Sequence, residues 1–128
     1  MAKNFYFVLI AGLLILPVDA LSQSKPLTKA EITRLISGKT EVGRVVRPSG
    51  GDIGPKGTRY TIRYAANGTF RYSAGSRSGR GQWNIRDNAL CRGFDGGRTS
   101  CRKIQRSGNG YVGVGFRSGS RRYTFQIR

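Results

Sequence analysis

The stretch RYTIRYAANGTFRYSA, residues 59–74, decides the fold. Apolar and aromatic side chains recur at every second position on both sides of Asn67–Gly68, with basic or polar side chains between them. Such alternation predicts strands with one buried face, because successive side chains of a strand point to opposite sides. Asn-Gly between two alternating runs is the strongest short signal for a β-hairpin. The stretch therefore predicts two antiparallel strands joined by a tight turn.

The same pattern extends through the rest of the chain. One strand is expected before the hairpin and five after it, at residues 39–46, 82–86, 89–94, 99–106, 111–117 and 121–128. The segment GSRSGRG, residues 75–81, is expected to be a loop. Eight short strands joined by tight turns predict an all-β antiparallel meander. A small closed eight-stranded barrel is the natural form because closure leaves no free edge, and a two-sheet sandwich is the alternative.

One helix is expected before the strands, near residues 29–37. Thr28 and Glu31 fit a capping box, in which each side chain bonds the backbone N–H of the other residue. Leu27 and Ile32 stand where a hydrophobic staple forms, and Gly38 can take the left-handed cap. The apolar face of this helix is expected to cover one end of the sheet or barrel.

Residues 1–20 are expected to be a secretory signal peptide. Lys3 precedes an apolar run at residues 5–18, and small residues follow it. Cleavage is expected after Ala20, with a site near Ser22 as the alternative. An uncleaved anchor is the other interpretation, but the run is shorter than the about 20 apolar residues of a membrane span. The mature chain, residues 21–128, is then one periplasmic or secreted domain with no membrane span.

The charge of the chain is extreme. It carries 23 Lys and Arg against 6 Asp and Glu, a net charge of +17 at pH 7. Alternation places the basic side chains on the outside of the sheet as a lattice, so an anionic polymer is the expected partner. Lipopolysaccharide, teichoic acids, acidic glycans and extracellular DNA are the candidates for an exported protein. The candidate polyanion-binding residues are Arg59, Arg63, Arg71, Arg86 and Arg122.

The rings alternate with these arginines and should face inward. The inward-facing residues are expected to be Tyr60, Ile62, Tyr64, Phe70, Tyr72, Trp83, Ile85, Tyr123, Phe125 and Ile127. Rings and arginines on opposite faces disfavour sequence-specific nucleic-acid binding, because a stacking surface needs both on one face. A second hypothesis is a small-ligand carrier whose barrel cavity is lined by Tyr60, Tyr64, Tyr72, Trp83 and Tyr123. Inhibition of another enzyme is a third.

The residue types present argue against catalysis. No His occurs, so a Ser-His or Cys-His pair cannot form, and two cysteines alone cannot supply a zinc site. No pair of acids is spaced to suggest a general acid and base. The GNGYVG match at residues 108–113 lacks the helix and the later acid of a dinucleotide site. The protein is therefore expected to be no enzyme and to hold no metal or cofactor.

Cys91 and Cys101 are the two cysteines of the chain. They lie symmetrically about Gly96 in a predicted turn, so they should face each other on adjacent antiparallel strands. In an oxidising compartment such a pair forms a disulfide. Because Leu90, Phe94 and Ile104 take the inward face, the bridge is expected on the outer face.

Several segments together resemble a family of small secreted proteobacterial domains of unknown function. They are AEITRLISGKT, YAANGTF, GRGQWNI, NALC and RSGNGYV, which span most of the mature chain. The resemblance rests on a leading helix that ends in Ser-Gly-x-Thr, a Gly-x-Trp strand and two cysteines on neighbouring strands. It implies export and a lipocalin-like β-barrel, and it brings no established activity.

Overall fold

A computed structural model describes residues 25–48 and 53–128. The predicted signal peptide and its cleavage site lie outside these residues. The described elements are the helix α1 (Lys29–Ile36) and the strands β1 (Thr40–Val45), β2 (Arg59–Tyr64), β3 (Thr69–Ala74), β4 (Arg77–Arg86), β5 (Ala89–Phe94), β6 (Thr99–Ser107), β7 (Gly110–Gly115) and β8 (Arg121–Ile127).

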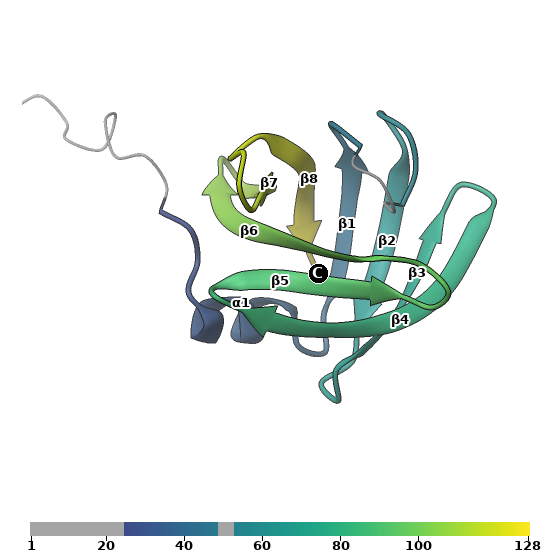
Figure 1. Ribbon diagram of the computed structural model, residues 1–128, viewed down its shortest axis with the longest axis horizontal. Helices are drawn as coiled ribbons and strands as arrows, with labels where there is room; N and C mark the ends of the chain where they lie inside the picture. Colours follow the sequence, from purple (N-terminus) through teal and green to yellow (C-terminus); the bar gives the residue numbers. More distant parts are fainter. Residues whose placement is uncertain (1–24, 49–52) are drawn as a thin grey trace, which may run out of the picture.

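The eight strands form a closed antiparallel barrel in sequence order (Figure 1). Each strand pairs with the next, and β1 pairs with β8, so that Glu41 lies opposite Ile127 and Val45 opposite Tyr123. This last pairing removes the two free edges of the meander. The predicted all-β barrel with one N-terminal helix is confirmed, and the sandwich alternative is excluded.

Strand β4 begins earlier than the sequence predicted. Residues 75–81 were expected to form a loop, but β4 starts at Arg77, opposite Ala74, and only a tight turn at Gly75–Ser76 separates it from β3. Gly79 and Gly81 of this strand give space to rings of β3. An added Cβ would lie 2.7 Å from the Tyr72 ring at Gly79 and 2.6 Å from the Phe70 ring at Gly81. These glycines therefore serve packing, and the prediction of a loop was wrong because it took them for turn residues.

The barrel interior holds an aromatic core. All ten side chains predicted to face inward are buried in it or packed against it. Tyr60 meets Tyr123 edge-on at 5.7 Å between ring centroids, and Phe70 meets Phe94 at 5.2 Å. Edge-to-face rings at this spacing add to the stabilisation that burial of their apolar area provides.

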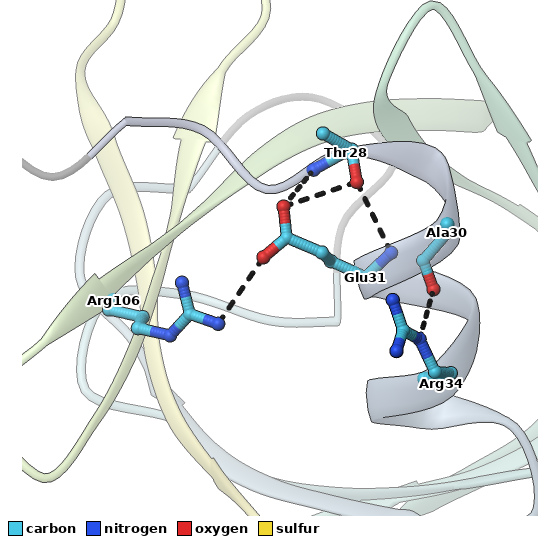
Figure 2. A network of polar contacts seen from close by, with 5 residues as sticks. All are labelled: Thr28, Ala30, Glu31, Arg34 and Arg106. Atoms are coloured by element: carbon cyan, nitrogen blue, oxygen red, sulfur yellow. Dashed lines mark hydrogen bonds and ion pairs between the residues drawn. The ribbon is translucent and has the colours of Figure 1, made fainter.

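Helix α1 packs against this core and is fixed at its N-terminus. The predicted capping box is present: Thr28 Oγ1 accepts from the Glu31 N–H, and Glu31 Oε1 accepts from the Thr28 N–H at 3.2 Å (Figure 2). The other Glu31 oxygen pairs with Arg106 of β6 at 3.3 Å. The Glu31 carboxylate thus binds both Thr28, at the start of α1, and Arg106. These bonds lower the pKa of Glu31 below its ordinary value, the backbone bond at Thr28 most of all.

Three apolar residues of this segment, Leu27, Ile32 and Ile36, join the core. The Lys29 N–H also donates to Asn88 Oδ1 at 2.8 Å, in the β4–β5 turn. Figure 1 accordingly shows α1 beside that end of the barrel. The helix thereby buries its apolar face, as its periodicity predicted.

The two cysteines form the predicted disulfide. Cys91 of β5 lies directly opposite Cys101 of β6, with the Cα atoms 4.0 Å apart. Leu90 of β5 and Ile104 of β6 belong to the core and mark the inward face of their strands. Cys91 lies on the other face of β5, in register with the exposed Asn84. The bridge therefore lies on the outer face of the barrel and joins two strands that are already hydrogen-bonded.

Candidate functional site

Three exposed arginines form a row across the outside of the barrel. Arg63 of β2 lies opposite Arg71 of β3, and Arg71 lies opposite Arg80 of β4. Adjacent strands are about 4.8 Å apart, so the row crosses the sheet at right angles to the strands with one guanidinium per strand. We call these three residues the arginine row. Like charges at opposed positions destabilise a sheet, so the fold itself has no need of this arrangement.

The other predicted arginines lie at separate places. Arg59 is exposed and lies opposite Arg44, which makes a second cross-strand pair between β1 and β2. Arg86 is exposed at the far end of β4, opposite Ala89. Arg122 is half-buried and donates from Nη1 to the Pro48 carbonyl at 3.3 Å. The structure therefore brings Arg63 and Arg71 together, and it separates Arg86 and Arg122 from them.

Sequence reasoning missed Arg80 and Arg44 as members of these groups. Arg80 was expected in a loop, and its place in the row follows from the early start of β4. Arg44 shares the outward face of β1 with Val42, but which residue lies opposite it depends on register. Alternation alone could have signalled that both face outward.

Negative charge is sparse beside the arginine row. The exposed acids of the described residues are Asp87 and Asp95, both in turns. Asp95 follows the row at its β4 end, because its N–H donates to the Arg80 carbonyl at 3.0 Å. Within residues 25–48 and 53–128, no ion pair is formed by Arg63, Arg71 or Arg80. The three guanidinium groups of the row are therefore not neutralised by ion pairs within the described residues.

The interior contains a charged cluster that sequence reasoning did not predict. Glu41 of β1 and Arg92 of β5 are each 2 % exposed, and they pair at 3.4 Å. Tyr64 links the two: its hydroxyl donates to Glu41 Oε1 at 2.9 Å and accepts from Arg92 Nη1 at 3.5 Å. Arg92 also lies over the Tyr123 ring, 5.0 Å from its centroid.

Two arginines outside the predicted lattice face inward. Arg92 and Arg102 are both buried, and Arg102 lies over the Tyr123 ring, 5.5 Å from its centroid. Arg92 lies two residues from Leu90 and from Phe94, and Arg102 lies two residues from Ile104, so each shares the inward face that was predicted for those residues. The predicted lattice did not name these two arginines, although the alternation already contained the signal.

Burial sets the ionisation of this cluster. Burial raises the pKa of Tyr60 and Tyr64 well above the ordinary value, and the Glu41 carboxylate adds to the effect. Both phenols therefore stay neutral, and Tyr64 keeps the proton that it donates to Glu41. Burial disfavours the charge of Arg92, but the nearby Tyr64 and Glu41 oxygens outweigh this and raise its pKa. The Glu41–Arg92 pair is thus held by the neutral hydroxyl of Tyr64.

Of the five residues proposed to line a cavity, only Tyr123 lines the interior cavity of the barrel. Tyr60, Tyr64 and Tyr123 are buried, and Tyr72 and Trp83 are half-buried. A cavity beside Tyr123, lined also by Glu41 and Arg92, measures about 10 Å³. A volume of this size holds at most one water. Gly43 makes room for the Tyr60 hydroxyl, since an added Cβ would lie 2.7 Å from it.

The carboxylate of this cluster is fully engaged within the barrel. Glu41 is the one buried acid among the described residues, and its oxygens are bound to Tyr64 and Arg92.

Two further findings concern membrane-spanning helices and similarity to known proteins. No helix in the described part of the chain is long and apolar enough to cross a membrane. Comparison with protein-family models, with curated proteins and with solved structures finds no match for this chain.

Proposed function

We propose that this protein is an exported, non-enzymatic barrel that binds anionic envelope or extracellular polymers through its outer arginines. The observation that carries the proposal is the arginine row, in which Arg63, Arg71 and Arg80 lie side by side on three adjacent strands. Arginine makes bidentate bonds to phosphate, sulfate and carboxylate groups. A row of such groups suits a polymer that carries repeated negative charges.

Two properties of the chain support this function. A net charge of +17 attracts polyanions over long distances. The Cys91–Cys101 disulfide is compatible with an oxidising compartment, where envelope polymers occur. The proposed family of small secreted domains of unknown function would place the protein in the same setting.

The carrier hypothesis has less support. Pockets for small ligands usually measure about 300–1,000 Å³. The interior cavity beside Tyr123 has about 10 Å³, and the tyrosines around it pack against one another and against the Glu41–Arg92 pair. A packed interior of this kind favours a binding function on the outer face.

Binding to heparin and to lipopolysaccharide, measured over a range of salt concentrations, tests the proposal. Each anionic contact releases about 0.7–0.9 counterions, so the logarithm of affinity should fall steeply with the logarithm of salt. The triple variant R63Q+R71Q+R80Q should make this slope shallower by about 2–3, since three contacts are lost.

The control removes the same charge elsewhere. The triple variant R98Q+R117Q+R121Q takes three exposed arginines from the β5–β6 and β7–β8 regions. It should lower affinity through net charge alone and leave more of the slope in place. A wild-type affinity that does not change with salt, or equal effects of the two triple variants, would falsify the proposal that the row binds polyanions.

A further inference from the structure

A groove runs over the outside of the barrel where β1, β7 and β8 meet. Its volume is about 520 Å³, and its lining includes the opposed residues Val112 and Thr124 and also Val42, which lies opposite Gln126. The cross-strand pair Arg44 and Arg59 stands at one end. Figure 1 shows β7 and β8 on the side of the barrel away from β3.

The groove continues toward helix α1. A second hollow of about 500 Å³ shares Asn109, Tyr111 and Gln126 with the first, so the two hollows are adjacent. At its far end stand Arg34 of the helix and Lys39. Lys39, directly before β1, and Arg44 of β1 are five residues apart, which corresponds to about 17 Å in an extended strand.

The chemistry of the groove changes along its length. Cations stand at both ends: Arg44, Arg59, Arg34 and Lys39 are all exposed. Between them lie amide side chains, the hydroxyl of Thr124 and the half-buried Tyr111. The Tyr111 ring is held by Phe125, stacked at 5.6 Å with an interplanar angle of 23°. This ring packs against the core, so the groove itself offers spaced positive charge and hydrogen-bonding groups.

We propose, building on polyanion binding as the protein's function, that this groove binds a short segment of an acidic glycan. Carboxylate or sulfate groups would lie on the cations at the two ends, and sugar hydroxyls would bond Asn109, Gln126 and Thr124. The arginine row then adds affinity for longer chains without selecting their chemistry.

Nucleic acid fits the groove less well. Single strands gain their affinity by stacking bases on exposed rings. In the described part of the chain, Phe116 is the one large hydrophobic side chain that is exposed. It follows β7, lies beside Lys103 of β6 and is outside the groove. The hydroxyl- and amide-rich middle of the groove matches sugars instead.

Two matched arginine pairs provide the test. R44Q+R59Q and R63Q+R71Q each remove two exposed arginines at opposed positions on adjacent strands, one pair in the groove and one outside it. Binding of a uronic-acid tetrasaccharide, measured by calorimetry, should weaken at least about tenfold more with R44Q+R59Q. Both pairs should weaken binding of long heparin chains.

A second comparison changes shape without charge. Thr124→Tyr fills the groove, whereas Ser73→Tyr places the same ring at an exposed position of β3. The first should abolish the binding of the tetrasaccharide and the second should preserve it. In spectra of the isotope-labelled wild type, amide signals of Gly110, Val112 and Gln126 should shift when the tetrasaccharide is added.

The outcomes separate the groove from the proposed function. The proposal that the groove binds an acidic glycan is overturned if the two arginine double variants weaken tetrasaccharide binding equally. It is also overturned if the wild type binds long heparin but no tetrasaccharide. Either result leaves the proposal of polyanion binding intact. A single-stranded oligonucleotide of equal charge that binds as tightly and shifts the same amides shows that the partner class is wrong. A wild type that binds neither heparin nor the tetrasaccharide overturns both proposals.

Discussion

Glu41 is the residue on which the interior charge of the barrel depends. A buried ion pair gains stability only where further hydrogen bonds satisfy its polar atoms, because removing two charges from water costs several kcal/mol for each ion. Tyr64 meets this condition by donating to Glu41 and accepting from Arg92. The Tyr123 ring below Arg92 offers its negative face as well. The pair is therefore stabilising only as a complete cluster.

Removing the charge of Glu41 should destabilise the barrel strongly. Glu41→Gln keeps the size of the side chain but leaves Arg92 buried without its counter-charge, so we expect a loss of about 3–5 kcal/mol in the free energy of unfolding. Urea denaturation followed by Trp83 fluorescence measures this loss.

The chain offers a matched control for this substitution. Glu31→Gln also breaks one Glu–Arg pair, with Arg106, but on the surface, and Gln can still cap the helix. Exposed pairs contribute about 0–1 kcal/mol, so the effect should be small. The double variant E41L+R92M should recover much of the loss, since it leaves no buried charge alone. Similar losses for Glu41→Gln and Glu31→Gln would contradict the role given to burial.

At the scale of elements, alternation and turn residues predicted most of the barrel. The hairpin at Asn67–Gly68, the helix cap at Thr28 and the opposed cysteines all follow from local patterns, and the structure confirms them. The early start of β4 did not follow, because Gly79 and Gly81 resemble turn residues. Glycine is found at these two positions because two rings of β3 lie over them. Only the register of β3 against β4 brings the rings and the glycines together.

The β5–β6 hairpin gives an element-scale prediction. The disulfide closes a loop with a sequence separation of 10, so it should stabilise the fold by about 2–3 kcal/mol through the entropy of the unfolded chain. The double variant C91A+C101A should lose this amount in urea denaturation and should keep the far-ultraviolet spectrum of the barrel, because backbone pairing continues on both sides of the bridge.

Chemical reduction of the wild type serves as the comparison for that variant. It removes the same cross-link without changing side-chain volume, and the thermal midpoint should fall to a similar extent. If the midpoint of the reduced protein equals that of the oxidised protein, the disulfide does not stabilise the hairpin.

At the scale of the whole molecule, long-range pairing limited what the sequence could predict. Barrel and sandwich share the same local patterns, and the choice between them lies in the pairing of β1 with β8 across the whole domain. The Glu41–Arg92 pair joins residues 51 positions apart for the same reason. The groove, with cations from α1, β1 and β2, likewise exists only after closure. Local alternation indicates the face that a residue occupies but not its neighbours on that face.

The net charge of the folded protein leads to the last prediction. At about 0.01 M salt the Debye length is about 30 Å, so positive charges repel one another across the whole barrel, and at 0.15 M it falls to about 8 Å. The thermal midpoint should therefore rise with added NaCl. Heparin added at low salt should raise it further than NaCl of equal ionic strength, because a ligand that binds the folded state at 100 times its Kd adds about 2.7 kcal/mol.

This comparison distinguishes an organised site from net charge. The unfolded chain carries the same +17 and also attracts heparin, but only the folded barrel aligns Arg63, Arg71 and Arg80. Heparin should therefore stabilise the wild type and stabilise R63Q+R71Q+R80Q much less, whereas R98Q+R117Q+R121Q should keep most of the effect. A midpoint that heparin lowers, or raises equally in both triple variants, would mean that charge alone attracts the polymer and that the order of the arginines on the barrel has no part in binding.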